Sequence, residues 1–154
     1  MGDENRAAIF TKFICKQFPK AETICCVADG KGHLARKLAN KGKRVIVYEP
    51  KPRFEGPLHK LICYYQDEFS RDTDVQADLI VGMHPDEATA EILLSAQRQG
   101  KPWAIVPCCV KGIEAVGVQR KFNVWLAKLK KLANYQCQEY QLKMNGKNLC
   151  LYRK

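Results

Sequence analysis

The sequence predicts an α/β fold, with a mostly parallel seven-stranded sheet, helices on both faces and a C-terminal antiparallel hairpin. Short apolar runs that alternate with amphipathic helical patterns carry most of this prediction, because strand–helix–strand units build a parallel sheet that helices cover on both faces. The hairpin follows from two β-prone runs, residues 135–144 and 147–152, on either side of Asn145-Gly146. Asn-Gly between such runs favours a two-residue type I′ turn, in which both central residues have positive φ.

Five apolar runs are expected to form the parallel strands. Each is short and nearly continuous in apolar residues, which is typical of a strand that is buried on both faces. Prolines stop the second and the fifth run, because proline cannot donate a hydrogen bond to a neighbouring strand. The five runs are residues 24–27, 44–49, 61–65, 78–82 and 103–106.

Four segments have apolar residues at helical spacing and are expected to form helices. Pro19 ends the first of them, and Gly42 follows the second as a C-terminal cap. The last has an apolar stripe that includes Trp125 and Leu129, opposite a face rich in Lys and Arg. The four segments are residues 4–18, 33–40, 86–99 and 119–133.

Length and composition indicate one globular domain over residues 1–154, since domains commonly span about 100–200 residues. Hydrophobic residues make up 46% of the chain, which excludes an intrinsically disordered protein. No apolar run reaches the about 18 residues that a membrane-spanning helix needs, so no membrane association is expected. The first six residues include two acids and no apolar core follows, so we expect no signal peptide.

The eight cysteines are expected to be reduced and buried as small hydrophobic residues, in a reducing compartment such as the cytoplasm. No Cys-x-x-Cys pair occurs, but Cys25-Cys26 and Cys108-Cys109 are vicinal pairs. We expect Cys108 and Cys109 to serve packing and loop shape and to bind no metal. His84 is the only nitrogen ligand expected near them, and it would leave the ligand set incomplete.

The chain has 26 Lys and Arg residues against 16 Asp and Glu residues, a formal net charge of +10. Such an excess favours RNA or another polyanion as a partner, because binding to phosphates is largely electrostatic. A basic surface without a partner is the alternative. A homo-oligomer or a protein partner would suit so small a domain, but no residue pattern indicates one.

Candidate ligand-binding residues gather at the carboxyl ends of the predicted strands, where ligands bind in open parallel sheets. Residues 29–34 connect the first strand to its helix, and their glycines let the backbone approach a ligand. Glu49 ends the second strand, 19 residues after Gly30, where an acid can bind both hydroxyls of a ribose. These features favour a nicotinamide dinucleotide or S-adenosylmethionine. A last helix followed by a hairpin favours the second, since it looks like the class I methyltransferase topology.

Three segments follow one another in a specific order. They are the glycine loop 30–34, residues 82–89 (Gly-Met-His-Pro-Asp-Glu-Ala-Thr) and residues 106–109 (Val-Pro-Cys-Cys). They resemble one family of methyltransferase domains, which carries a GxGKGxL loop, an LHxCDxAT-type segment and a PCC segment and includes tRNA ribose methyltransferase relatives. The resemblance covers roughly residues 22–112. It implies a Rossmann-like class I methyltransferase fold with S-adenosylmethionine as the cofactor.

The resemblance also implies roles for single residues. The loop glycines would pass beneath the methionine part of the cofactor, Glu49 would bind its ribose, and Asp67 would lie near the adenine. Residues 82–84 would line the side on which the methyl group is transferred. The implied cofactor-binding set is therefore Ala28, Asp29, Gly30, Lys31, Gly32, His33, Leu34, Glu49, Asp67, Gly82 and Met83.

The sequence departs from that family at three positions. Cys26 stands where the family has an acid, Ala28 where it has the first glycine of the loop, and Pro85 where it has a cysteine. Asp29 is a candidate substitute for the missing acid. These departures keep open a non-catalytic binding module of the same fold, for RNA or a protein partner. A nicotinamide-dependent oxidoreductase is a weaker alternative, because no Tyr-x-x-x-Lys motif and no separate substrate domain is found.

We therefore predict an S-adenosylmethionine-dependent methyltransferase with RNA as the preferred acceptor. The sulfonium of that cofactor makes its methyl group electrophilic, so the protein mainly has to orient the acceptor. His84 is the candidate group that orients or deprotonates the acceptor, with Asp86 as its neighbour. Basic residues expected at the same edge would hold the phosphate backbone: Lys51, Arg53, Lys111, Arg120 and Lys121.

Overall fold

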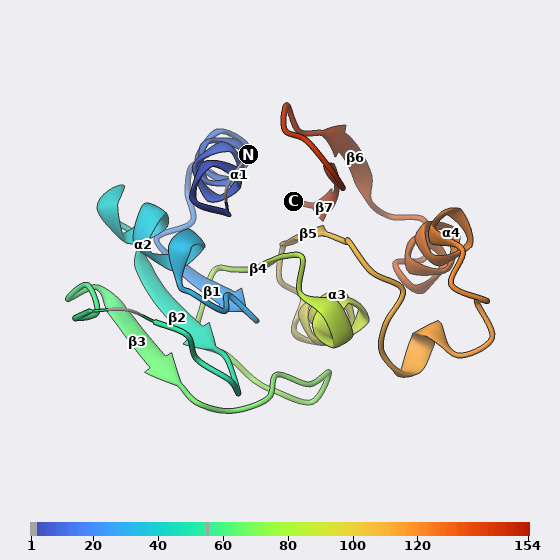
Figure 1. The fold of residues 1–154 in the computed structure, drawn as a ribbon, viewed down its shortest axis with the longest axis horizontal. Helices are drawn as coiled ribbons and strands as arrows, with labels where there is room; N and C mark the ends of the chain where they lie inside the picture. Colours follow the sequence, from blue (N-terminus) through green and yellow to red (C-terminus); the bar gives the residue numbers. More distant parts are fainter. Residues whose placement is uncertain (1–2, 55) are drawn as a thin grey trace.

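The computed structural model describes residues 3–54 and 56–154, which form one seven-stranded sheet with helices on both faces (Figure 1). The strands are β1 (Thr23–Val27), β2 (Arg44–Tyr48), β3 (Ile62–Tyr65), β4 (Leu79–Met83), β5 (Trp103–Val106), β6 (Gln138–Gln141) and β7 (Leu149–Arg153). Their order is β3-β2-β1-β4-β5-β7-β6. The first five strands in this order are parallel, whereas β7 pairs antiparallel with both β5 and β6.

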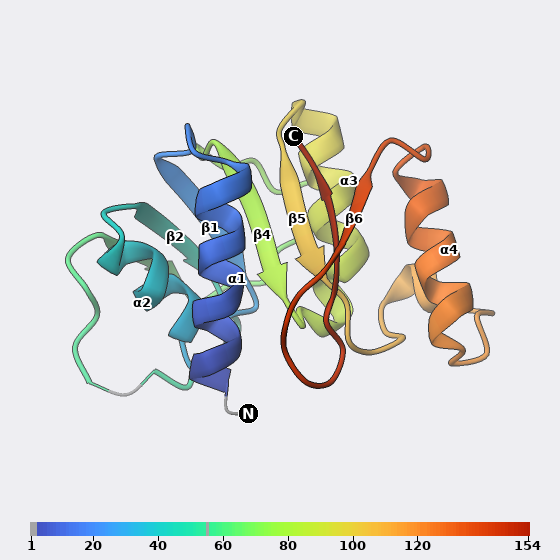
Figure 2. The same cartoon turned by 90° about the horizontal axis from the view of Figure 1, so that it is seen from above.

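The helices form one layer on each face of the sheet (Figures 1 and 2). One layer consists of α1 (Asp3–Gln17) and α2 (His33–Asn40), and the other of α3 (Thr89–Gln99) and α4 (Phe122–Leu132). Two 3₁₀ turns, η1 (Asp86–Ala88) and η2 (Ile113–Ala115), precede α3 and α4. The strand–helix–strand units thus place helices on both faces, as a parallel sheet requires.

Each helical layer covers a hydrophobic core of its own. Phe10 and Leu34 lie in the core under α1 and α2, and Ile92 lies in the core under α3 and α4. Successive residues of β1 alternate between the two cores, so that Cys26 faces the first and Cys25 the second, and both are fully buried. Full burial of a large apolar side chain such as Phe10, Leu34 or Ile92 stabilises a fold by roughly 1.5–3 kcal/mol.

The cysteines are free, as the sequence analysis predicted, but they are not all buried. Cys25, Cys26 and Cys150 are buried, whereas Cys63 is exposed. The prediction of burial is wrong for Cys63 because β3 is the edge strand of the sheet, and alternate residues of that strand face solvent.

The predicted fold class is confirmed, including the parallel strands and the antiparallel C-terminal pair. Each parallel strand lies within one residue of its expected bounds. Two helices begin later than expected, α3 at Thr89 and α4 at Phe122. Asp86 has a φ of 51° and Arg120 a φ of 56°, and an α-helix does not begin at such residues because their backbone is left-handed.

The type I′ turn predicted at Asn145-Gly146 is wrong. Gly146 has a φ of 80°, but Asn145 does not have a positive φ, and the paired strands end at Gln141 and resume at Leu149. Leu142 and Met144 in the intervening loop are buried in the core under α1 and α2. Their burial favours a longer loop over a tight turn.

The carboxyl ends of the parallel strands lie at one edge of the sheet, which faces the viewer in Figure 1 and points downwards in Figure 2. The loop between β6 and β7 lies at the same edge in Figure 2. In the part of the chain that the structure describes, we find no helix with the length and apolar character needed to cross a membrane.

Candidate functional site

The carboxylate of Glu49 joins the ends of β1 and β2. One of its oxygens accepts a hydrogen bond from the backbone N–H of Gly30 at 3.0 Å, and the other accepts one from the N–H of Lys51 at 2.9 Å. Glu49 is 8% exposed, and the hydroxyl of Tyr64 donates to its backbone carbonyl at 2.8 Å. Each carboxylate oxygen can accept a further hydrogen bond, so Glu49 keeps acceptors for a ribose hydroxyl.

Asp29 caps the start of α2. Its carboxylate accepts hydrogen bonds from the N–H groups of Leu34 at 3.2 Å and Ala35 at 2.8 Å. Burial raises the pKa of Asp29 to about 7, although these two N–H groups act in the opposite direction. The carboxylate of Asp29 therefore satisfies two N–H groups at the start of α2 that a ligand could otherwise bind, and the Leu34 side chain lies in the core. Because its carboxylate is bonded to α2, Asp29 is not free to act as the substitute acid considered for Cys26.

The turn after β1 needs a left-handed backbone at three residues. Ala28 has a φ of 58°, Gly30 of 53° and Gly32 of 79°. Glycine adopts this conformation readily, whereas a residue with a Cβ atom loses roughly 1–2 kcal/mol. The N–H of Ala28 donates to the Tyr48 carbonyl at 2.8 Å, which ties the strained residue to the end of β2. The family that the sequence resembles has glycine at this strained position.

The loop after β2 lies over the glycine turn. The N–H of Arg53 donates to the Gly30 carbonyl at 3.0 Å, and a Cβ atom at Gly30 would lie 2.7 Å from the Arg53 guanidinium. A Cβ atom at Gly32 would lie 2.3 Å from the Phe54 ring, whose centroid is 4.8 Å from that of Tyr64. The chain's own side chains thus cover both glycines. The sequence analysis missed the covering role of Phe54, because a contact between two loops leaves no periodic pattern.

His84 follows β4 and is held by the loop between β6 and β7. It has a φ of 52°, and its N–H donates to the Val106 carbonyl at 2.9 Å. Its Nε2 atom lies 2.9 Å from the carbonyl oxygen of Lys147. A carbonyl oxygen can only accept, so Nε2 carries the hydrogen, and Nδ1 has the free lone pair when the ring is neutral. His84 can therefore take up a proton at Nδ1.

Asp86 contacts the loop after β5. Its Oδ1 atom is 3.5 Å from the Cys108 sulfur, which is 3.3 Å from the Cys109 sulfur, and its Oδ2 atom is 3.7 Å from the Lys111 ammonium. Burial raises the pKa of the Cys108 thiol, and Cys109 and Asp86 raise it further. The sequence analysis paired Asp86 with His84, but the structure gives the two side chains different partners. The signal that could have joined Asp86 to the cysteines is that both follow neighbouring parallel strands.

The other predicted site residues lie at or just after the carboxyl ends of β1, β3 and β4. Gly82 is buried, and a Cβ atom there would lie 2.5 Å from a side chain of α3, so this glycine makes room for the helix. Met83 packs against the core under α1 and α2. Lys31 is exposed, and His33 is the first residue of α2. Asp67 is exposed beyond β3.

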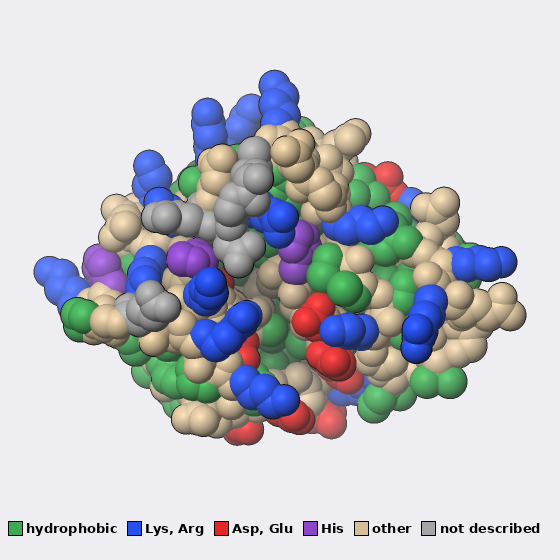
Figure 3. Space-filling model, viewed as in Figure 1, with side chains coloured by type: hydrophobic (Ala, Val, Ile, Leu, Met, Phe, Trp, Pro, Cys, Tyr) green, Lys and Arg blue, Asp and Glu red, His purple; other side chains and the backbone are tan. Residues whose placement is uncertain are grey.

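A hollow with a basic lining adjoins the two cysteines. It has a volume of about 520 Å³ and is lined by Cys108, Cys109, Val110, Lys111, Arg120, Phe122 and Lys147. The Lys147 ammonium lies 3.9 Å from the centroid of the Phe122 ring. Figure 3, which looks onto this edge, shows Lys and Arg side chains spread around a central depression. Lys147 was missed by the sequence analysis because the expected tight turn would have placed it in a strand.

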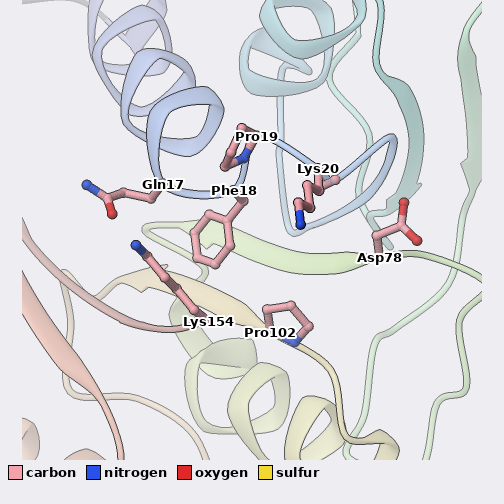
Figure 4. A pocket seen from close by; sticks show the side chains of 8 residues that line it. Gln17, Phe18, Pro19, Lys20, Asp78, Pro102 and Lys154 are labelled. Atoms are coloured by element: carbon pink, nitrogen blue, oxygen red, sulfur yellow. The ribbon is translucent and has the colours of Figure 1, made fainter.

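A second hollow lies at the opposite edge, near the amino ends of the strands (Figure 4). It has a volume of about 460 Å³ and is lined by Gln17, Phe18, Pro19, Lys20, Ala21, Asp78, Pro102 and Lys154. The Asp78 carboxylate accepts hydrogen bonds from the N–H groups of Glu22 at 2.9 Å and Thr23 at 3.0 Å. Asp78 therefore holds the start of β1, and none of the predicted site residues lines this hollow.

No protein-family model matches the sequence, and no curated protein matches it significantly. Solved structures do match its fold. A methyltransferase from an antibiotic biosynthesis pathway of Anabaena variabilis is similar with 13% identity and a TM-score of 0.62, over 86% of this chain and 63% of that chain. Human N-acetylserotonin methyltransferase, solved with S-adenosylmethionine, is similar with 14% identity and a TM-score of 0.62, over 99% and 52%. Magnesium protoporphyrin IX methyltransferase from Synechocystis, solved with S-adenosylhomocysteine, is similar with 11% identity and a TM-score of 0.64, over 98% and 83%.

These likenesses show that the chain has the Rossmann-like fold of class I S-adenosylmethionine-dependent methyltransferases. Because the sequence identities are only 11–14%, these likenesses support a conclusion about the fold alone. The chain spans 63% and 52% of the length of the first two structures.

Proposed function

We propose that the chain binds S-adenosylmethionine at the edge formed by the glycine turn and Glu49, and that it transfers the methyl group to RNA. The observation that carries this proposal is the hydrogen bond between Gly30 and Glu49 at the carboxyl ends of β1 and β2, in a fold shared with methyltransferases. The antiparallel β7 beside β5 disfavours the nicotinamide-dependent alternative, because the common dinucleotide-binding order is 3-2-1-4-5-6.

The residues at this edge fit the cofactor in kind. Glu49 offers carboxylate oxygens to ribose hydroxyls, and Gly30 and Gly32 form a cradle without side chains of its own. The ends of the Arg53 and Phe54 side chains fill that cradle in this structure, so binding requires them to turn away. The guanidinium of Arg53 and the ring of Phe54 lie at the far ends of their side chains, so they can move without any change in the sheet.

The reaction divides between the cofactor and the chain's own residues. The bound cofactor supplies an electrophilic methyl group on a sulfonium sulfur. His84 lies at the end of β4 and would orient the acceptor and take its proton at Nδ1. The Lys147 carbonyl fixes the ring through Nε2, so the lone pair of Nδ1 keeps one direction.

RNA is the acceptor class that the charges favour. The net charge is +10, and the basic hollow is lined by Lys111, Arg120 and Lys147 as well as by the aromatic ring of Phe122. Cations bind backbone phosphates, and an aromatic ring can stack on an unpaired base. The free cysteines are consistent with a reducing compartment, and we propose the cytoplasm.

A non-catalytic binding module is the second candidate. The observation in its favour is the cover that Arg53 and Phe54 place over the glycine turn. Cys26, which replaces the family's acid, is fully buried in the core and offers no polar group to a ligand. In this alternative the basic hollow binds RNA or an acidic protein, and the cofactor edge is closed.

Titration calorimetry of the full chain with S-adenosylhomocysteine tests the cofactor proposal, with NAD as the control ligand. We expect S-adenosylhomocysteine to bind and NAD to give no heat. Phe54→Ala should bind S-adenosylhomocysteine more tightly than the native chain, because the ring no longer fills the cradle. No binding by either protein would support the binding module.

Transfer of a labelled methyl group from S-adenosylmethionine to a pool of unmodified RNA tests the acceptor. RNA affinity should fall steeply as the salt concentration rises, since each phosphate contact releases counterions. Lys111→Ala and Arg120→Ala should lower both the affinity and the slope, whereas Lys41→Ala, at the end of α2, should change neither. Labelling of protein in place of RNA, or an affinity that does not depend on salt, would contradict this acceptor class.

A further inference from the structure

The turn after β4 and the loop after β5 bring three metal-ligating side chains together. Asp86, Cys108 and Cys109 each offer one ligand atom, and these atoms all lie within 4.8 Å of one another. The Cys108 sulfur is 3.3 Å from the Cys109 sulfur and 3.5 Å from the Asp86 carboxylate. Met83 and Val106 are paired at the ends of β4 and β5, so the sheet itself places the two loops side by side.

We propose that Asp86, Cys108 and Cys109 bind a zinc ion, with the fourth coordination position open to the basic hollow. Tetrahedral zinc lies about 2.3 Å from a thiolate and about 2.0–2.2 Å from a carboxylate oxygen. These lengths put two sulfurs about 3.8 Å apart and a sulfur about 3.6 Å from the oxygen. The observed 3.3 Å and 3.5 Å are within about 0.5 Å of those values, a difference that rotation of the thiols can supply.

The donor set favours zinc over magnesium or calcium. Thiolates are soft ligands that select zinc, whereas magnesium and calcium take oxygen ligands. The sequence analysis expected no metal because His84 left the set incomplete. In the structure the His84 ring contacts the Lys147 carbonyl, and Asp86 lies beside the two cysteines as the candidate third ligand.

The surrounding charges suit a site with two thiolates and a carboxylate, whose negative charge exceeds that of the zinc ion. The Lys111 ammonium is 3.7 Å from the second oxygen of Asp86, and Arg120 and Lys147 line the adjoining hollow. These cations offset the excess negative charge.

This site does not depend on the proposed methyl transfer. Three protein ligands with one open position are typical of zinc sites that bind water or a group of a ligand. Cys108 and Cys109 line the basic hollow, so an oxygen of a ligand that enters the hollow can reach the open position. The class of ligand is an oxyanion or a hydroxyl group, which the neighbouring cations also attract.

Zinc titration of the full chain, prepared metal-free under reducing conditions and read against a chromophoric chelator, tests the proposal. We expect one zinc ion per chain, and the cobalt-substituted chain should show thiolate charge-transfer absorption with tetrahedral bands. Cys108→Ser and Cys109→Ser should each weaken zinc binding by more than the about 10–100-fold that loss of an outer-shell partner costs. Asp86→Asn should weaken it as well, and Cys137→Ser, a partly buried cysteine before β6, should leave it unchanged.

A second measurement uses the native chain alone, in case a variant fails to fold. Bound zinc should protect Cys108 and Cys109 from alkylation, while the exposed Cys63 reacts equally with and without the metal. Absence of stoichiometric zinc, equal affinity in the serine variants, or unprotected thiols would each overturn the site. A Cys108–Cys109 disulfide in the protein isolated under reducing conditions would overturn it too. None of these results bears on S-adenosylhomocysteine binding, so failure of this site and failure of the cofactor proposal are distinguishable.

Discussion

The backbone N–H of Gly30 donates a hydrogen bond of 3.0 Å to the carboxylate of Glu49. This bond connects the turn after β1 with the end of β2, and Tyr64 from β3 adds a bond to the Glu49 carbonyl. Three neighbouring strands are thereby held together at the edge where open α/β sheets bind ligands. One side chain thus shapes the glycine turn and keeps acceptors for a ribose.

Glu49→Ala should weaken binding of S-adenosylhomocysteine by about tenfold or more, because hydrogen bonds to a charged group are worth about 1.5–3 kcal/mol and each 1.4 kcal/mol is tenfold. The same change should lower the free energy of unfolding, since the N–H groups of Gly30 and Lys51 lose their acceptor. Calorimetry and urea denaturation measure the two effects. Glu68→Ala removes an exposed acid and serves as the control. Unchanged affinity in Glu49→Ala would contradict the role in ribose binding.

Ala28→Gly should raise the free energy of unfolding by up to about 1 kcal/mol. The gain comes from relief of the left-handed backbone at φ 58°, reduced by the greater freedom of glycine in the unfolded chain. Urea denaturation of the variant and the native chain measures it. Ala127→Gly in the exposed face of α4 is the matched control and should lose about 1 kcal/mol. A loss of similar size at Ala28 would mean that its conformation carries no strain.

Most of the fold could be predicted from the sequence, because the patterns that indicate its strands and its helices are local. Buried parallel strands such as β5 read as short continuous apolar runs, and α2 has four buried residues at helical spacing. The misjudged C-terminal turn depended on a tertiary contact. Burial of Leu142 and Met144 in the core under α1 and α2 outweighs the preference of Asn145-Gly146 for a tight turn. No local sequence pattern predicts this burial.

The candidate site could be predicted from the sequence only in part. The spacing of Gly30 and Glu49 predicted their meeting, since parallel neighbouring strands place their ends together. The cover of Phe54 over Gly32 could not be predicted, because loops find each other through packing that has no sequence period. The contact between Asp86 and Cys108 could be predicted only in part. Adjacent strands imply that the two loops are close, but the direction of the Asp86 side chain depends on its left-handed backbone, which the sequence does not indicate.

Cys26→Asp should destabilise the protein by more than about 3 kcal/mol, although an acid at this position would match the resembling family. Cys26 is 0% exposed and packs in the apolar core under α1 and α2, and burial already raises the pKa of its thiol. A carboxylate there would lose its hydration without gaining a partner. Thermal and urea denaturation measure the loss.

Cys63→Asp is the matched control for that change, because Cys63 is exposed on the edge strand β3. It should cost less than about 1 kcal/mol, mostly through the low strand propensity of aspartate. Equal stability of the two variants would show that position 26 has access to solvent, and the acid could then be restored without harm.

Asp29→Asn should make the protein more stable than the native chain at pH 8, with a difference that disappears towards pH 4. The folded-state pKa of Asp29 is about 7, well above the about 3.9 of an unfolded chain. The stability that its protonated form contributes is therefore complete below pH 4 and is lost as the pH rises through 7. The difference should approach about 4 kcal/mol at most, at 1.36 kcal/mol per pKa unit. Asp78→Asn should be less stable than the native chain by a nearly constant amount from pH 4 to pH 8, because backbone N–H groups lower the pKa of Asp78 and its contribution is lost only below about pH 4. Urea denaturation between pH 4 and pH 8 decides, and parallel curves for native and Asp29→Asn proteins would contradict the prediction.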